Sequence, residues 1–321
     1  MWISPYKYYK YVLSLGHLYS DINQSILSAV LPFLIATYHY DYTTAAMLVT
    51  VSNVFGAFVQ PFIGMLSDKK NKLLYMTLGV LLASGGMAVT GFISNFFGLC
   101  IAVIMSGIGV AMFHPQAAKL INSVSSKNAK GKGMSIFSFG GKVGFTLGPV
   151  YTAFLMNLFG MKGTILFLIP GIVFGIVCSF FDKDFENLDV LEVEKKEKVK
   201  SEQKDDWSGF IKLCGVVFSR SILSNGISTF LAFYFIQQFS KSNSFASMIL
   251  SVFYGIGSIT LLGGGIADCF GHRKMVRLSF CIFLPAIFIF TNTSHFVIAL
   301  IMLIFMTCGE SLSYSPMVVL G

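Results

Sequence analysis

Charged residues are scarce in this chain of 321 residues. Only 12% of the residues are Asp, Glu, Lys or Arg, against about 25% in soluble globular domains. Ten of the fifteen acidic residues fall within residues 182–206, so the long stretches on either side hold almost no carboxylates. Inserting one ionised side chain into a membrane helix costs roughly 2.5–3.5 kcal/mol. The scarcity excludes an ordinary soluble domain and indicates a membrane protein.

Several chemical signatures are absent as well. The six cysteines have no regular spacing, which argues against a disulfide framework or a zinc site. The sequence contains no His-Glu-x-x-His motif and no two-metal carboxylate cluster, and residues 131–135 (GKGMS) lack the upstream glycine of a phosphate-binding loop. We therefore expect neither an enzyme nor an ATP-driven pump, and we expect no cofactor and no metal.

Ten apolar segments are long enough to span a bilayer, which takes about 20 helical residues. They are residues 11–37, 43–66, 73–93, 96–122, 133–157, 163–181, 211–237, 244–267, 275–291 and 296–319. The first is too long for a signal peptide. Because the segments lack the alternation of barrel strands, the predicted fold class is all-α, a polytopic membrane protein with about ten transmembrane helices.

The basic residues predict the orientation of these segments. With a cytoplasmic N-terminus, nineteen of the twenty-three Lys and Arg residues lie on the cytoplasmic side, and only Lys162 and Lys241 lie in outer loops. We predict a multi-pass protein of the cell membrane with its N-terminus in the cytoplasm. The net charge of +8 then belongs to cytoplasmic loops and does not indicate nucleic-acid binding. Residues 182–206 mix ten acids with six bases and are predicted to be a solvated linker.

Two charged loops reveal an internal repeat. GMLSDKKNK (64–72) and GGGIADCFGHRK (263–274) each place an aspartate four residues after a glycine, and the two aspartates lie 200 positions apart. The same offset aligns VLPFLIATY, from residue 30, with FLAFYFIQQ, from residue 230. Segments one to four therefore correspond in order to segments seven to ten.

The repeat predicts two parallel six-helix halves around a central cavity. The first half is residues 1–181, the cytoplasmic linker is residues 182–210, and the second half is residues 211–321. The second copy ends after its fourth helix. We therefore expect either a fragment of a longer protein or the product of a truncated gene.

Five stretches of the chain resemble the major facilitator superfamily, and within it the fosmidomycin-resistance group of exporters. They are GHLYSDINQSILSAVLPFL (16–34), GMLSDKKNK (64–72), MFHPQAAKL (112–120), SIFSFGGKVGFTLGPV (135–150) and GGGIADCFGHRK (263–274). The resemblance implies proton-driven export of small molecules, including antibiotics. The chain departs from the family pattern at Asn71, usually a glycine, at Gln116, where an acid is expected, and at Lys142, where an uncharged polar residue is expected.

The paired loops are predicted to form a conformational latch at the cytoplasmic ends of the helices. A carboxylate there can cap a helix and pair with a basic residue, while glycine lets helices approach closely. The latch residues are Gly64, Asp68, Lys72, Gly264, Asp268 and Arg273. Membrane topology alone accounts for the basic residues, but not for an aspartate four residues after glycine in both copies.

The first segment carries a polar face. The residues His17, Asp21, Gln24, Ser28 and Pro32 follow one another at steps of three or four, which places them on one side of a helix. Asp21 is the only acid on the first six segments, so we predict a proton-binding or substrate-contacting carboxylate with His17 as a partner. Gln24 and Ser28 are candidates for the substrate cavity. The alternative is a structural hydrogen-bond anchor between helices.

Four further ionisable residues within the apolar segments are candidates for the site. His114, next to Pro115, and Glu310 are additional candidates for proton coupling, although a structural role for His114 is an open alternative. The cations Lys142 and Arg220 suit an anionic substrate such as a phosphonate or carboxylate. They can also pair with Asp21 and Glu310, and Arg220 can also extend towards the cytoplasm.

The fifth segment carries Gly140, Gly144, Gly148 and Pro149, which predict a smooth packing face and a kink. This stretch resembles the helix-five signature of antiporters and so favours export over import. The predicted function is export of small molecules by proton antiport with alternating access. The expected partners are a small-molecule substrate, protons and the lipid bilayer, with the protein a monomer. The alternative is a non-transporting protein, either a degenerate transporter or a sensor derived from one.

Overall fold

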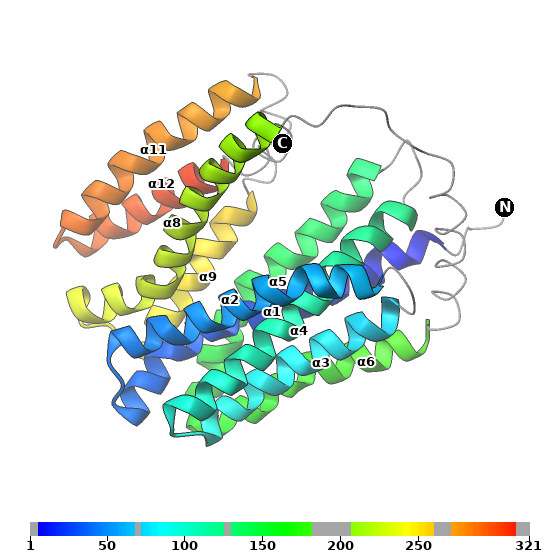
Figure 1. Cartoon of the computed structure of the whole chain (residues 1–321). Coiled ribbons are helices and arrows are strands. Elements are labelled where there is room, and N and C mark those ends of the chain that lie inside the picture. Colours follow the sequence, from blue (N-terminus) through cyan, green and yellow to red (C-terminus); the bar gives the residue numbers. More distant parts are fainter. Residues whose placement is uncertain (1–5, 68–71, 125–129, 182–206, 260–270, 313–321) are drawn as a thin grey trace. The chain divides into compact units, whose positions relative to one another are not determined.

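The computed structural model describes residues 6–67, 72–124, 130–181, 207–259 and 271–312, whose regular structure is entirely helical (Figure 1). The chain divides into two compact units, Met1–Lys200 and Ser201–Gly321, and each is described by itself. The division lies within the predicted linker. Residues 182–206 lie outside the described residues, and residues 207–210, predicted as linker, begin a helix. The all-α fold is confirmed.

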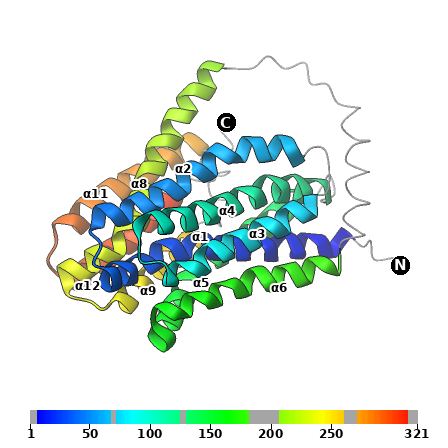
Figure 2. The same cartoon turned by 60° about the horizontal axis from the view of Figure 1, so that its bottom comes forward.

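The described residues of the first unit form six α-helices and two 3₁₀ segments. They are α1 (Tyr6–Tyr38), α2 (Tyr42–Ser67), α3 (Lys72–Val89), η1 (Thr90–Phe92), α4 (Phe96–Val124), α5 (Lys130–Phe159), η2 (Gly160–Phe167) and α6 (Leu168–Ser179). Figure 2 shows these helices running lengthwise beside one another. The helix α1 packs mainly on α5 and also on α4, while α3 packs on α4 and α6, and α2 packs on α4.

The second unit contains four described α-helices. They are α8 (Trp207–Phe239), α9 (Asn243–Ile259), α11 (His272–Asn292) and α12 (Phe296–Leu312). The helix α9 packs on α8 and α12, and α11 packs on α12. Phe235 is fully buried among aromatic rings from three helices, including Phe290 at 6.1 Å and Phe296 at 6.2 Å between ring centroids. These rings fasten one end of the unit.

Seven stretches of the described chain are long and apolar enough to cross a membrane. One of them, Gly133–Ser179, runs through α5, η2 and α6 and so covers two of the ten predicted segments. Within the described residues α9 and α12 have 17 residues each, which gives about 26 Å of helix at 1.5 Å per residue and falls short of a hydrocarbon core of about 30 Å. The predicted count of ten spanning helices is therefore wrong by this criterion.

The core of the first unit is apolar and closely packed. Phe113 of α4 and Phe174 of α6 are fully buried and meet edge to face, with 6.0 Å between ring centroids. Gly16 of α1 lies against both rings, because a Cβ there would stand 2.6 Å from Phe174 and 2.8 Å from Phe113. The outer surface is apolar too, with Phe97 and Phe180 more than three quarters exposed. Hydrocarbon, rather than water, suits such a surface.

The turn between α1 and α2 carries one acid outside the membrane-spanning helices. Asp41 precedes α2, and its Oδ1 accepts a hydrogen bond from the backbone N–H of Thr44 at 2.8 Å. This is the geometry of a helix N-cap. Hydrogen bonds from Thr44 hold the pKa of Asp41 below its usual value, because they favour the charged carboxylate.

Candidate functional site

Glycines on α5 bring its backbone against the backbone of α1. A Cβ on Gly140 would collide with the Ser14 carbonyl of α1, and a Cβ on Gly144 would collide with the Leu18 carbonyl. Gly148, one turn further along, faces the Ser25 hydroxyl in the same way. The helix continues through Pro149 without a break. This close approach sets the position of every polar side chain that α1 turns towards α5.

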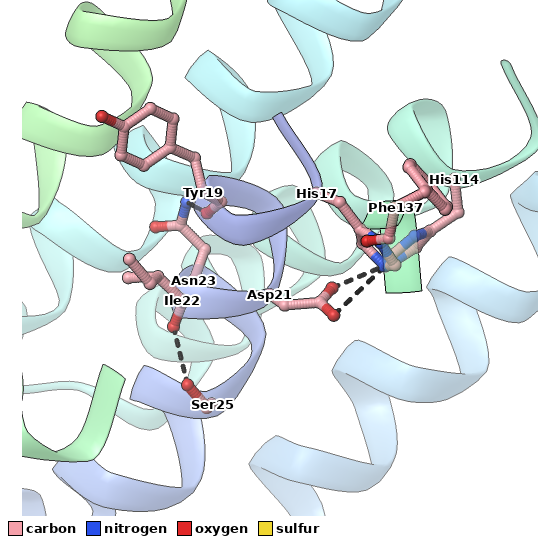
Figure 3. Close-up of polar contacts among 8 residues, drawn as sticks. All are labelled: His17, Tyr19, Asp21, Ile22, Asn23, Ser25, His114 and Phe137. Atoms are coloured by element: carbon pink, nitrogen blue, oxygen red, sulfur yellow. Dashed lines mark hydrogen bonds and ion pairs between the residues drawn. The ribbon is translucent and has the colours of Figure 1, made fainter. Parts of the chain in front are cut away.

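Three ionisable side chains meet beside this contact and form what we call the His–Asp–His cluster, made of His17, Asp21 and His114 (Figure 3). Nε2 of His17 lies 3.2 Å from Oδ2 of Asp21, one turn along α1. Nε2 of His114, on α4, lies 3.4 Å from Oδ1 of the same carboxylate. The Asp21 side chain is only 5% exposed. A buried carboxylate thus lies between two imidazoles from two different helices.

The carbonyl of Phe137 on α5 holds the ring of His17. Nδ1 of His17 lies 2.9 Å from this oxygen. The aromatic ring of Phe137 also stacks on the imidazole, with 4.0 Å between centroids and 21° between the planes. Oδ1 of Asp21, by contrast, is buried and makes no hydrogen bond of good geometry with the described residues. In the cluster, His17 is therefore held tightly by Phe137, whereas Oδ1 of Asp21 can still accept a hydrogen bond.

Gly141 leaves the space that the cluster occupies. A Cβ at this position would stand 2.5 Å from Oδ2 of Asp21 and 2.6 Å from both Cε1 and Nε2 of His17. Real Cβ atoms do not approach other heavy atoms this closely, so a larger residue would displace His17 or Asp21. The sequence prediction missed Gly141, since it lies one position off the four-residue spacing. The double glycine at 140–141 was the available signal.

The cluster is also the group of described His, Cys, Asp and Glu residues whose ligand atoms lie close enough together to hold a metal ion, all within 4.8 Å. The Nε2 atoms of His17 and His114 face the two carboxylate oxygens of Asp21 directly, at ion-pair distance. This arrangement equally suits side chains that exchange a proton with one another.

The rest of the predicted polar face of α1 is divided. Ser28 is buried, whereas Gln24 is exposed on the first unit. Asn23, which the prediction left out, is fully buried and lies beside Tyr19 in Figure 3. Its Nδ2 donates to the Tyr19 carbonyl at 2.9 Å and to the Ser84 hydroxyl of α3 at 2.9 Å. Asn23 thus ties α1 to α3 two residues after Asp21.

Lys142 lies next to Gly141 on α5 and is half-buried. Gly141 faces both His17 and Asp21, so its neighbour Lys142 lies beside the His–Asp–His cluster.

A second buried charge pair lies in the second unit. The Arg220 guanidinium of α8 forms an ion pair with the Glu310 carboxylate of α12, and the two side chains are 17% and 12% exposed. The Ser311 hydroxyl donates to the second carboxylate oxygen at 3.3 Å. A cavity of about 10 Å³, the size of one water molecule, adjoins the pair and Ser279. Of the alternatives for Arg220, the structure therefore favours pairing with Glu310 over extension to the cytoplasm.

The predicted latch is only partly described. Asp68, Gly264, Asp268 and the side chain of Lys72 lie outside the described residues, and Arg273 is exposed. No described atom lies within 4 Å of where a Cβ on Gly64 would stand. The Gly64 carbonyl instead accepts a hydrogen bond from Lys119 Nζ of α4 at 3.3 Å. Lys119, which the prediction missed, thus supplies a cation to the C-terminal end of α2.

The chain is similar in sequence to known membrane proteins. Residues 13–321 match the model of the Major Facilitator Superfamily. The chain is 23% identical over 269 residues to the fosmidomycin resistance protein of Escherichia coli (strain K12), covering 82% of this chain and 66% of that protein. It is 28% identical over 148 residues to the multi-drug resistance efflux pump PmrA of Streptococcus pneumoniae serotype 4 (strain ATCC BAA-334 / TIGR4), covering 44% of this chain and 36% of the pump. The chain thus spans just under two thirds of the first relative.

The fold is similar to that of a solved transporter. A bacterial homologue of the human lysosomal transporter Spinster, crystallised in an inward-facing and occupied conformation, superposes with a TM-score of 0.82. The match covers 98% of this chain and 74% of that one at 17% sequence identity. At this identity the likeness concerns the fold alone.

Proposed function

Because the chain belongs to the Major Facilitator Superfamily, a family of membrane transporters, we propose that it exports small molecules across the cell membrane in exchange for protons. The observation that carries the proposal is the His–Asp–His cluster. A carboxylate buried in a membrane-spanning helix is costly unless it is paired, and such groups mark ion and proton pathways. Asp21, with His17 and His114 as partners, is the proposed proton-binding group.

The direction of transport is proposed from the relatives. One is a resistance protein and another is an efflux pump. The glycine-rich face of α5, which resembles an antiporter signature, supports the same direction. The chain covers only part of both relatives, so their activities support export here without establishing it.

The substrate class is proposed from the buried cations. Arg220 is held by Glu310, and Lys142 lies at the edge of the cluster. A small anion such as a phosphonate or carboxylate offers the same oxygen acceptors as Glu310 and suits an Arg fork. Glu310 is then a second carboxylate whose protonation would release Arg220 for substrate. We further propose that the loops around Asp68 and Asp268 act as the cytoplasmic latch, with the N-terminus on the same side.

Efflux from vesicles tests this proposal. The 321-residue chain is reconstituted in proteoliposomes, and a pH gradient with an acidic lumen is imposed. Chains inserted in the inverted orientation export into the lumen, so the assay measures the accumulation of fosmidomycin there against its own concentration gradient. Export by antiport predicts accumulation that collapses with a protonophore and is lost in Asp21→Asn. The control is Gly175→Ala on α6, where an added Cβ would meet only side-chain carbons, at 3.7 Å or more. Accumulation that ignores the gradient contradicts antiport, and no accumulation of any anionic probe favours the non-transporting alternative.

A further inference from the structure

The Phe137 carbonyl determines where one proton of the cluster resides. A carbonyl oxygen only accepts hydrogen bonds, so its 2.9 Å contact with Nδ1 of His17 requires a hydrogen on Nδ1. In the neutral ring Nε2 is then an acceptor. It faces Oδ2 of Asp21, a second acceptor, at 3.2 Å. Two acceptors keep this distance favourably only when a proton lies between them.

We infer that His17 and Asp21 share a single exchangeable proton between Nε2 and Oδ2, and that Gly141 and the Phe137 carbonyl are the positioning elements that make this sharing possible. The inference rests on the proposed function and deepens it. In the loaded pair the proton resides on Nε2, opposite a carboxylate, or on Oδ2, opposite a neutral ring. Unloading passes that one proton to water and leaves a neutral His17, protonated on Nδ1, and an Asp21 carboxylate. The charge of the pair falls by one.

The surrounding helices oppose a second proton. His114 of α4 faces Oδ1 of Asp21 at 3.4 Å, and Lys142 of α5 directly follows Gly141, which faces the pair. The helices α2 and α6 contain no acidic, basic or histidine residue, and α3 contains only Lys72, at its first position. A doubly protonated pair would be a buried cation, and the described helices of the first unit carry no acid besides Asp21 itself. Its desolvation is costly, so the pair exchanges one proton rather than two.

Proton occupancy also decides which helix holds Asp21. In the loaded state the carboxyl group is satisfied within α1 by His17. After unloading, the lone pair on Nε2 of His17 repels the carboxylate, because Nδ1 keeps its hydrogen on the Phe137 carbonyl and the tautomer cannot change. Nε2 of His114 lies beside Oδ1, which lacks a hydrogen bond of good geometry, and donates to that oxygen when Nε2 carries a hydrogen. Unloading therefore strengthens the link between α1 and α4.

Gly141 permits this arrangement because its missing side chain leaves room for the pair. A methyl group there would stand 2.5 Å from Oδ2 and 2.6 Å from Nε2, against both atoms that share the proton. Gly175 of α6 provides a matched control in the same unit. A Cβ at Gly175 would meet only side-chain carbons, at 3.7 Å from Thr77 and 3.9 Å from Leu81.

Nitrogen-15 NMR of the histidine rings tests the inference. The 321-residue chain, labelled with ¹⁵N-histidine in lipid nanodiscs, is titrated from about pH 4 to pH 9, which brackets the ordinary values of Asp and His. The His17 signals are those lost in His17→Asn, a variant that keeps an N–H donor for Phe137. We expect Nδ1 to remain protonated throughout and Nε2 to change in one step. Asp21→Asn should displace that step by about one pH unit or more, a tenfold change in proton affinity.

Two results would overturn the inference. One is loss of the Nδ1 hydrogen during the titration, and the other is an Nε2 step that Asp21→Asn leaves in place. Gly141→Ala should abolish the dependence on Asp21, whereas Gly175→Ala should titrate as the wild type does. If Gly141→Ala does not fold, the Asp21→Asn comparison still decides the shared proton.

The NMR readout needs no transport. Efflux that does not depend on the proton gradient would therefore contradict the proposed function without altering the titration. Proton-driven efflux combined with a His17 titration that does not depend on Asp21 would instead contradict only the shared proton.

Discussion

Replacing Gly144 by alanine is expected to destabilise the first unit, because α1 and α5 touch backbone to backbone at that point. The new methyl group would collide with the Leu18 carbonyl and would lie 3.1 Å from Cβ of Asp21 and from the backbone nitrogen of Ile22. A carbonyl in the middle of a long helix cannot turn aside as the end of a flexible side chain can. The helices must separate, and packing along their whole contact weakens.

A second glycine variant isolates the size of this effect. Gly85→Ala in α3 introduces the same methyl group into a helix, but the nearest atom, Cδ2 of Leu168, would be 4.0 Å away. The gain in helix propensity, up to about 1 kcal/mol, is common to both changes and cancels in the comparison. The difference that remains is the cost of overpacking, about 1–3 kcal/mol. Gly144→Ala should be less stable than Gly85→Ala by that amount.

Reversible unfolding of both variants in the same mixed micelles, followed by circular dichroism, measures the difference. The wild type and Gly175→Ala serve as references. If Gly144→Ala and Gly85→Ala agree within about 0.5 kcal/mol, the range of ordinary surface substitutions, α1 and α5 are not in backbone contact. The placement of the His–Asp–His cluster would then be unsupported.

Three further predictions concern charges. Glu310→Gln removes the carboxylate that pairs with Arg220 and should cost about 3 kcal/mol in chemical denaturation, whereas replacing both residues by Met should restore most of the loss. Equal stability of the two variants would argue against a largely buried ion pair. Asp41 has a lowered pKa in the folded protein, so it stabilises the fold at pH values above its unfolded-state pKa of about 3.9, and this stabilisation disappears as the pH falls through the lower folded-state pKa. Melting temperatures across that pH range should therefore depend less on pH in Asp41→Ala than in the wild type. An unchanged pH profile would exclude the cap. Asp68→Asn and Asp268→Asn should reduce efflux unequally, because the first loop has Asn71 where the second has Gly271, and unchanged efflux in both variants would exclude the latch.

Much of the fold could be predicted from hydropathy alone. Long apolar segments separated by short polar turns require helices in a membrane, since every backbone group must be satisfied within its own segment. The helix ends are less well determined, because the apolar pattern fades at interfaces. The 3₁₀ segment η2 joins α5 to α6 almost without interruption, so a stretch predicted as two segments contains one apolar run.

The site could be predicted only in part. His17 and Asp21 are one turn apart on one helix, and local spacing therefore places them together. The approach of His114 depends on how α4 packs against α1, which a single sequence does not specify. The same limitation applies to Arg220 and Glu310, for which pairing was one of several alternatives.

Residues that act through their backbone or by lacking a side chain were missed. The Phe137 carbonyl carries no sequence signal, because every residue has a carbonyl. In the sequence Gly141 resembles any glycine at a helix contact. Only its short distance to Asp21 and His17 in the structure shows that it leaves room for these two side chains. Lys119 appeared as one of many cytoplasmic cations, although it reaches the end of α2.

Substrate-induced proton movement tests the central claim most directly. Proteoliposomes holding the 321-residue chain, with a pH-sensitive dye inside and no imposed gradient, receive fosmidomycin outside. Proton antiport through Asp21 predicts that substrate entry drives protons out, so the lumen becomes more alkaline in the wild type and in Gly175→Ala but not in Asp21→Asn. Substrate entry without a change in internal pH, or an equal change in Asp21→Asn, would contradict the account.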